Sequence, residues 1–527
     1  MDSGEAGTME RITVAADRSI VGFGPVKTLI GTVDKSAWPR EALIGLRLIS
    51  PEDPAGNAVR SEASLTDAAQ AHERIRFFLR DRLIRNFRDV ARAYLDSGGA
   101  PMVEVTNAER LDAGSRAFFE VMGNVPNVHV TLRLGATGDE GADSGDEAGD
   151  EGVLTRRPTA TETRIDALAQ APALDAKEQD FLYEQAVDLL GVGDSWSAVR
   201  ILEALLRHRN TPPVWGRLGL AHAMLGRTLE AEFCYLRWCE DPDPVSAAGA
   251  HYGLAMLYAR HHPAHLRSLD RTAQHLEFGH EILQKAPSDT PDLEFHRVFN
   301  RNGYALVEFR RGRVQEAIQH LTEGIEKLRS GSGKHHMHQT VLIYNLAQCY
   351  RRSGNLPMAI ETYEKLLAVD GNMPEYHMEL AHCHLDAESF ESALDALITA
   401  RELGPSITEV HSLLGYTHLQ LGLTEEAVAS YHRAHLCAPR SYDTFYDYVY
   451  ALAEAGRSAE VLAVATGRPT HDLTPEQHGG LLTLVAEQHT LLGNWAEARD
   501  ALEHVLRLTP DHPDARTNLD LVVEAMA

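Results

Sequence analysis

A repeating pattern of small residues, glycines and prolines in the last two thirds of the chain limits its fold more than any other feature. The small residues Ala347, Ala381 and Gly415 recur at a period of about 34 residues, which is typical of proteins built from stacked repeats. Further copies of the pattern precede and follow these three. Most copies also carry a glycine seven positions after the small residue, and several end in a proline; these residues are Gly226, Gly312, Gly354, Gly422, Gly493, Pro405, Pro439 and Pro510.

Each copy of the pattern predicts two antiparallel helices joined by a short turn. The small residue lets the two backbones approach closely, the glycine relieves the end of the first helix, and the proline stops the second helix. One pair of helices cannot bury its own apolar face, so the pairs are expected to stack side by side. We therefore predict an α-solenoid over residues 178–527, of about nine units with a C-terminal capping helix.

The pattern resembles the tetratricopeptide repeat (TPR) family. That resemblance implies a continuous groove, lined by the first helices, that holds a partner protein or peptide. Some members clamp a carboxylate with Lys, Asn and Arg, whereas the matching places here carry other residues, such as Glu375 and Met378. The predicted binding surface consists of Tyr344, Gln348, Arg351, Arg352, His382 and Tyr416. The alternative is that Arg351 and Arg352 are solvated cations at a helix end.

An acidic run separates this repeat region from the start of the chain. Residues 136–152 contain seven carboxylates, no basic residue and no large apolar residue. Such a segment cannot bury enough surface to offset its chain entropy, so it predicts a disordered linker. The predicted organisation is a module over 1–135, a linker and lead-in over 136–177, and the solenoid over 178–527.

The segment 1–135 predicts a small α/β module. A helical pattern at 70–96 precedes a strand at 102–105, a helix around 118–122 and a strand at 128–132. The stretch 101–134 resembles a fragment of P-loop (STAND-type) ATPases, but Thr106 and Asn107 replace the acidic pair that would hold magnesium. Residues 22–28 would supply the phosphate loop, with Lys27 and Thr28 as the nucleotide-binding candidates. Because Pro25 lacks an amide donor and no glycine precedes Lys27, we expect a degenerate module without a cofactor.

The charge balance excludes several classes of protein. Asp and Glu outnumber Lys and Arg by 76 to 50, a formal charge of −26, which argues against binding nucleic acid or coating an anionic membrane. Five cysteines without a CxxC pair indicate a reducing compartment. With no long apolar stretch and no apolar segment near the N-terminus, we expect a cytoplasmic protein.

Histidine is abundant, with 27 copies. His335 and His338 are the candidate metal ligands, but the chain has no HExxH motif and no Cys/His pairing, so we expect no metal site. His222, His384, His418 and His489 recur at one phase of the repeat, which favours a packing role.

These observations predict a non-catalytic scaffold or adaptor that binds a protein or peptide in the solenoid groove, since neither GxSxG nor a Rossmann fingerprint is present. One alternative is a regulatory nucleotide-binding protein with the solenoid as its sensor. Another is an accessory protein or enzyme acting on a peptide or natural-product intermediate. Self-association as a homo-oligomer stays open.

Overall fold

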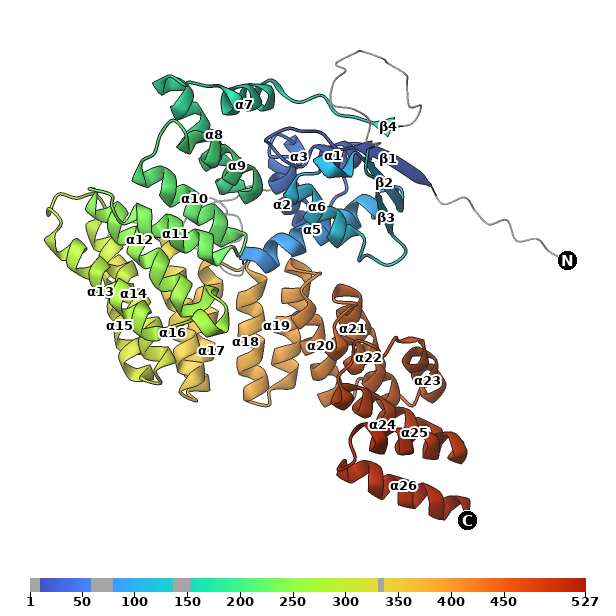
Figure 1. Cartoon of the computed structure of the whole chain (residues 1–527). Helices are drawn as coiled ribbons and strands as arrows, with labels where there is room; N and C mark the ends of the chain where they lie inside the picture. Colours follow the sequence, from blue (N-terminus) through green and yellow to red (C-terminus); the bar gives the residue numbers. More distant parts are fainter. Residues whose placement is uncertain (1–9, 58–78, 136–152, 330–335) are drawn as a thin grey trace. The chain divides into compact units, whose positions relative to one another are not determined.

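The computed structural model describes residues 10–57, 79–135, 153–329 and 336–527. The chain divides into two compact units, Met1–Tyr376 and His377–Ala527, and each is described by itself. The predicted fold class is confirmed: the protein is mainly α, an α-solenoid of antiparallel helix pairs preceded by a small α/β module (Figure 1). No helix of the described segments has the length and apolar character needed to cross a bilayer.

The α/β module of the first unit is built on a four-stranded parallel sheet. Its strands are β1 (Arg11–Ala15), β2 (Met102–Thr106), β3 (His129–Leu132) and β4 (Val153–Leu154), in the order β3-β2-β1-β4. The predicted strands at 102–105 and 128–132 correspond to β2 and β3. In β4, Val153 pairs with Thr13 of β1, so the sheet includes residues beyond position 135, where the predicted module ends.

Helices cover this sheet and supply its core. They are α1 (Gly24–Ile30), α2 (Arg40–Ile49), α3 (Pro54–Asn57), α5 (Leu79–Asp96) and α6 (Ala113–Met122). Phe23, Phe87 and Phe118 are fully buried and contact one another edge to face in sequence order, Phe23 on Phe87 and Phe87 on Phe118. Because large aromatic rings bury much apolar area, this cluster joins the loop before α1 to α5 and α6.

The rest of the first unit consists of helical hairpins. Its elements are α7 (Ala160–Gln170), α8 (Ala176–Val192), α9 (Ser195–Leu206), α10 (Pro212–Met224), α11 (Thr228–Trp238), α12 (Pro244–Met256), a π-helical turn (Leu257–His261), α13 (Leu269–Lys285), α14 (Leu293–Arg310), α15 (Val314–Arg329), α16 (His336–Arg352) and α17 (Leu356–Val369). The pairs α8–α9, α10–α11, α12–α13, α14–α15 and α16–α17 follow one another along the chain.

The second unit continues the same construction. Helix α18 (Pro374–Asp386) begins in the first unit, and the second unit then holds α19 (Phe390–Leu403), α20 (Thr408–Gln420), α21 (Thr424–Cys437), α22 (Tyr442–Glu454), α23 (Ser458–Gly467), α24 (Pro475–Leu491), α25 (Trp495–Leu508) and α26 (Pro513–Met526). The hairpins α20–α21, α22–α23 and α24–α25 stack in turn, and α26 packs on α25 at the end of the chain.

The residues that identify the repeat in the sequence have the conformations it predicts. The turn glycines Gly226, Gly312, Gly354, Gly422 and Gly493 all have φ between 72° and 79°, a left-handed backbone that disfavours residues with a Cβ. At Gly415 an added Cβ would lie 2.5 Å from the Tyr431 ring of the next helix. The small residue therefore sets how closely the two helices of a pair approach.

Candidate functional site

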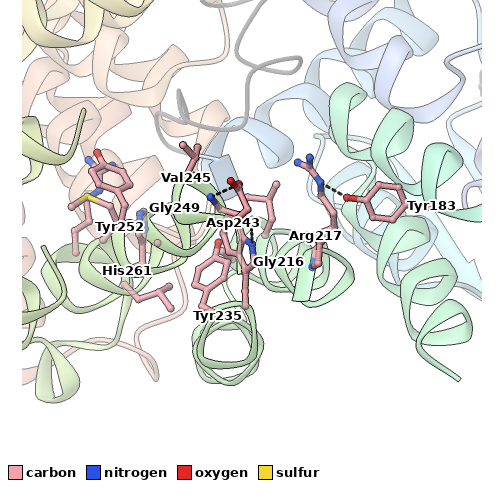
Figure 2. A pocket seen from close by; sticks show the side chains of 18 residues that line it. Tyr183, Gly216, Arg217, Tyr235, Asp243, Val245, Gly249, Tyr252 and His261 are labelled. Atoms are coloured by element: carbon pink, nitrogen blue, oxygen red, sulfur yellow. Dashed lines mark hydrogen bonds between the residues drawn. The ribbon is translucent and has the colours of Figure 1, made fainter. Parts of the chain in front are cut away.

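The first unit contains a hollow of about 350 Å³ on the side of the solenoid where its first helices lie (Figure 2). Helices α8, α10 and α12 are the first helices of three consecutive hairpins, and all three contribute to its lining. The lining includes Tyr183, Gly216, Arg217, Leu220, Tyr235, Trp238, Asp243, Ser246, Tyr252, Gly253, Met256, Arg260 and His261. We call this hollow the α10/α12 pocket. Its volume falls in the range of pockets that enclose a small ligand or a side chain.

Glycines on α10 and α12 pack directly against two aromatic rings of α11, and both rings line the pocket. A Cβ on Gly216 would lie 2.7 Å from the Trp238 ring, and one on Gly253 would lie 2.9 Å from the Tyr235 ring. The two rings lie 5.8 Å apart between centroids, and Trp238 Nε1 donates a 2.7 Å hydrogen bond to Ser246 Oγ. The pocket therefore has an apolar floor, and the packing of its rings leaves no room for a side chain at positions 216 and 253.

Polar groups surround the apolar floor. Arg217 Nε donates to Tyr183 Oη at 3.3 Å, and burial lowers the pKa of Arg217. Desolvation by neighbouring parts of the chain, together with the charges of Arg260 and Arg267, lowers the pKa of His261, although this residue is exposed. Asp243 caps α12 by accepting a 2.9 Å hydrogen bond from the Ser246 amide. The pocket thus combines an apolar floor with the positive charges of Arg217 and Arg260.

This arrangement suits binding better than chemistry. A hollow with an apolar floor and a few polar groups around it is typical of sites that bind ligands. Across the segments that the structure describes, no group of three or more His, Cys, Asp or Glu residues could hold a metal ion.

The predicted surface residues occupy different environments. Tyr344 on α16 is only 5% exposed, and its ring packs on Tyr363 and Tyr376. Gln348 donates to Tyr344 Oη at 2.8 Å, while Arg351 and Arg352 lie in the last turn of α16.

The other two members of this predicted surface belong to the second unit. His382 lies 3.4 Å from Glu409 Oε1, and Tyr416 is 44% exposed. Since four members lie in one unit and two in the other, the combined surface stays a prediction.

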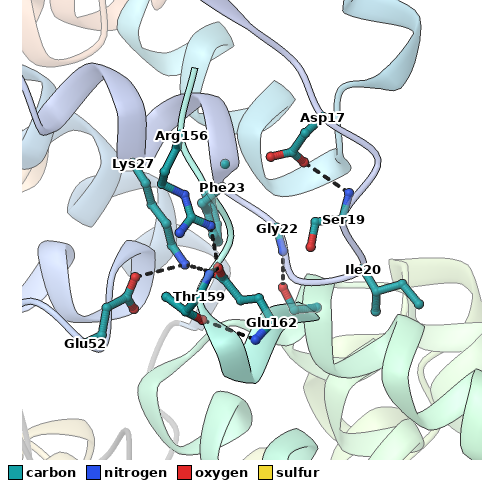
Figure 3. Close-up of polar contacts among 12 residues, drawn as sticks. Asp17, Ser19, Ile20, Gly22, Phe23, Lys27, Glu52, Arg156, Thr159 and Glu162 are labelled. Carbon is teal, nitrogen blue, oxygen red and sulfur yellow. Dashed lines mark hydrogen bonds and ion pairs between the residues drawn. The ribbon is translucent and has the colours of Figure 1, made fainter. Parts of the chain in front are cut away.

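The nucleotide-binding candidates lie between the α/β module and α7 (Figure 3). Lys27 is 7% exposed, and its Nζ lies 2.8 Å from Glu162 Oε1 and 3.3 Å from Glu52 Oε1. Thr28 Oγ1 donates to the Gly24 carbonyl at 3.0 Å. Lys27 is therefore paired with carboxylates of its own chain, and the resemblance of 101–134 to ATPases stays a prediction.

The candidate metal ligands are not placed. His335 and the side chain of His338 lie outside the described residues. The histidines predicted to pack behave in two ways: His222 and His418 are buried, whereas His384 and His489 are half-buried. His418 Nδ1 lies 3.1 Å from Ser430 Oγ of the next helix, as expected for an imidazole with one hydrogen bond.

Comparisons with known proteins identify the repeat in the middle of the chain. Models of the tetratricopeptide repeat match residues 297–371, 344–406 and 378–443. The chain therefore contains TPR repeats, as predicted, and TPR domains generally bind other proteins. A comparison with curated proteins gave no match.

Among solved structures, the chain is similar to several TPR proteins. YrrB, whose description names an unusual peptide-binding site, is 18% identical over 37% of this chain and 96% of its own, with a TM-score of 0.32. A TPR protein from Parabacteroides merdae is 13% identical over 52% and 98%, and pilF of Pseudomonas aeruginosa is 16% identical over 44% and 99%, each with a TM-score of 0.32. Similarities this low say nothing about a ligand of this chain.

The repeat pattern of the sequence does not predict the α10/α12 pocket. Tyr235 and Trp238 are part of the repeat pattern, where they signal packing alone. The available signal was the set of glycines at 216, 249 and 253, which fall on first helices where other copies carry larger residues.

Proposed function

We propose that this protein is a non-catalytic adaptor that binds a partner protein or peptide in the groove of its repeats, with the α10/α12 pocket receiving one apolar side chain of that partner. The observation that carries this proposal is the pocket itself. The rings of Tyr235 and Trp238 line it together with residues of three successive first helices, α8, α10 and α12.

The lining residues set the kind of segment that fits. Leu220 and Met256 extend the apolar surface beside the two rings, and Tyr183 and Tyr252 add amphipathic side chains. Burying one Leu- or Phe-sized side chain there contributes about 1.5–3 kcal/mol, which corresponds to roughly a tenfold to hundredfold gain in affinity. Arg217 and Arg260 would donate hydrogen bonds to backbone carbonyls or to a carboxylate of the bound segment.

The proposal is tested with a library of random linear peptides displayed against the full chain. Selected peptides should share one apolar or aromatic position. Their affinity should fall about tenfold or more for Leu220→Asp, which puts a charge into the apolar part of the pocket.

The matched control is Leu236→Asp. Leu236 lies on α11, is 50% exposed and does not line the pocket, so this variant should bind as the unmodified chain does. Circular dichroism shows whether both variants are folded. Peptides that bind both variants equally well, or a library that yields no saturable binder, would refute a partner-binding role for the pocket.

A further inference from the structure

The second unit carries a large share of the chain's negative charge. Residues 377–527 contain 23 Asp and Glu, eight Arg and no Lys, a formal charge of −15 out of −26 for the whole chain. A surface of one sign attracts oppositely charged partners and raises their rate of association. A binding site for such a partner requires that carboxylates of this unit gather on one accessible surface.

Six residues on three first helices bring tyrosine rings and carboxylates together. We call Tyr416, Tyr446, Asp447, Tyr450, Glu454 and Glu487 the tyrosine–carboxylate strip. Tyr416 lies on α20 and Glu487 on α24, while the other four lie on one face of α22, between these two helices. Tyr416 and Tyr450 are 44% and 40% exposed, so their rings are accessible to a ligand.

The three helices of the strip adjoin one another, since α22 contacts both α20 and α24. A Cβ on Gly480 of α24 would lie 4.0 Å from Tyr446 Cε2, which places α24 against this face of α22. Interaction with the Glu454 carboxylate, four residues further along α22, raises the pKa of Tyr450. Burial, followed by the charges of Glu487 and Asp447, raises the pKa of Tyr446, so carboxylates from both helices act on one ring.

The strip also reaches α20. Burial raises the pKa of Tyr431, the residue that packs on Gly415 of α20, and Asp447, Tyr416 and Tyr450 raise it further. The charges of these three residues on α20 and α22 therefore act on a single phenol.

The carboxylates of the strip are not neutralised by the arginines of this unit. Arg457 pairs with Glu425 and Glu460, Arg468 with Asp472, and Arg499 with Asp500 and Glu503. Among the described residues, Asp447, Glu454 and Glu487 form no ion pair. Burial and the neighbouring charge of Asp443 raise the pKa of Asp447, as expected for a carboxylate that lacks a counter-ion.

We propose that the tyrosine–carboxylate strip binds an extended cationic segment, rich in Arg or Lys, of a partner polypeptide. The carboxylates supply counter-charges, and the tyrosine rings supply faces over which a guanidinium or ammonium group is attracted. A surface that carries both tyrosine rings and carboxylates suits a segment with several basic residues. This inference rests on the proposed function in one respect, since both take the ligand to be a polypeptide.

The test uses the full chain and a fluorescently labelled peptide of alternating arginine and serine, with binding followed by anisotropy. The same peptide with glutamate in place of arginine is the charge control. We expect saturable binding of the arginine peptide alone, weakening as salt is added. Asp447→Asn combined with Glu487→Gln should weaken binding about tenfold or more, and Tyr450→Leu, which keeps the charge, about threefold or more.

A second double variant distinguishes the effect of the strip's carboxylates from the effect of the overall charge of the unit. Glu497→Gln with Asp520→Asn removes the same two charges from exposed positions elsewhere in this unit and should change affinity less than about twofold. Equal weakening by both double variants, or no saturable binding by the unmodified chain, would overturn the proposal. Leu220→Asp should leave binding of the arginine peptide unchanged, so failure at the strip and failure at the α10/α12 pocket are distinguishable.

Discussion

At the scale of single residues, Glu162 shows how buried charges join the α/β module to the helices that follow it. It is 4% exposed, and Lys27 Nζ and Arg156 Nη2 lie 2.8 Å and 2.7 Å from its two carboxylate oxygens. It also completes a capping box with Thr159 at the start of α7. Burial opposes its ionisation, but the charge of Lys27 and the hydrogen bonds outweigh burial and lower its pKa to about 2.

The lowered pKa of Glu162 predicts a dependence of stability on pH. Because the folded-state pKa lies below the usual value of 4.5, the stabilisation is present above pH 4.5 and is lost as the pH falls towards 2. Glu162→Gln should therefore lower the free energy of unfolding at pH 7 by up to about 3 kcal/mol. It should also flatten the loss of stability between pH 4.5 and 2. Urea unfolding at a series of pH values measures both effects.

A largely exposed acid provides the control for this experiment. Asp180 pairs with Arg209 at 2.8 Å, but its side chain is 64% exposed, so Asp180→Asn should change stability by less than about 1 kcal/mol. An acid profile of Glu162→Gln that follows that of the unmodified chain would show that Glu162 does not stabilise the junction between the module and α7.

Sequence reasoning could not have placed Lys27. The run from Gly22 to Thr28 lacks the glycine that precedes the lysine of a phosphate loop, so its local pattern argues against that role but does not say what Lys27 contacts instead. The residue that Lys27 contacts, Glu162, lies 135 residues further along the chain and is separated from Lys27 by the acidic run. Only the fold brings the two together.

At the scale of the helical hairpin, sequence and structure agree because the determinants are local. The glycine of each turn and the small residue of each first helix lie within one copy of the repeat, so their roles can be inferred without knowing how units stack. The α10/α12 pocket is different, since α8, α10 and α12 form it jointly. No single copy of the repeat contains it.

Close approach within a hairpin gives a prediction for Gly415. An added Cβ would lie 2.5 Å from Tyr431 Cδ2 and 2.6 Å from its Cε2, so either the ring or the helix must move. We expect Gly415→Ala to lower the free energy of unfolding by about 1–3 kcal/mol. Gly467→Ala is the control, because a Cβ at the end of α23 meets nothing within 4 Å, and alanine there should be neutral or slightly stabilising. Thermal unfolding compares the two; equal midpoints would contradict close packing at Gly415.

At the scale of the first unit, the α/β module contacts helices that lie far apart in the sequence. Near the start of the solenoid, Trp196 of α9 stacks on Phe87 at 5.6 Å and meets Phe23 edge to face at 5.8 Å. Near the end of the unit, Arg85 Nη2 of α5 lies 2.5 Å from Glu375 Oε1 in the first turn of α18. Sequence analysis assigned Glu375 to the groove, whereas the structure pairs it with the module. Helix α5 therefore links the first hairpin of the solenoid to the last helix of this unit, which makes the module part of the unit's framework.

The ion pair between Arg85 and Glu375 allows the contribution of the module to the stability of the first unit to be measured. Glu375 is 5% exposed; burial opposes its ionisation, but Arg82 and Arg85 lower its pKa. Arg85→Ala would leave a buried carboxylate with a weakened counter-charge and should lower the free energy of unfolding by about 3 kcal/mol. Adding Glu375→Gln removes the uncompensated charge, so the double variant should recover part of that loss. Hydrogen exchange should show faster opening of α5 and residues 374–376 in the single variant. An effect of Arg85→Ala that Glu375→Gln does not relieve would mean that the two side chains stabilise the unit independently.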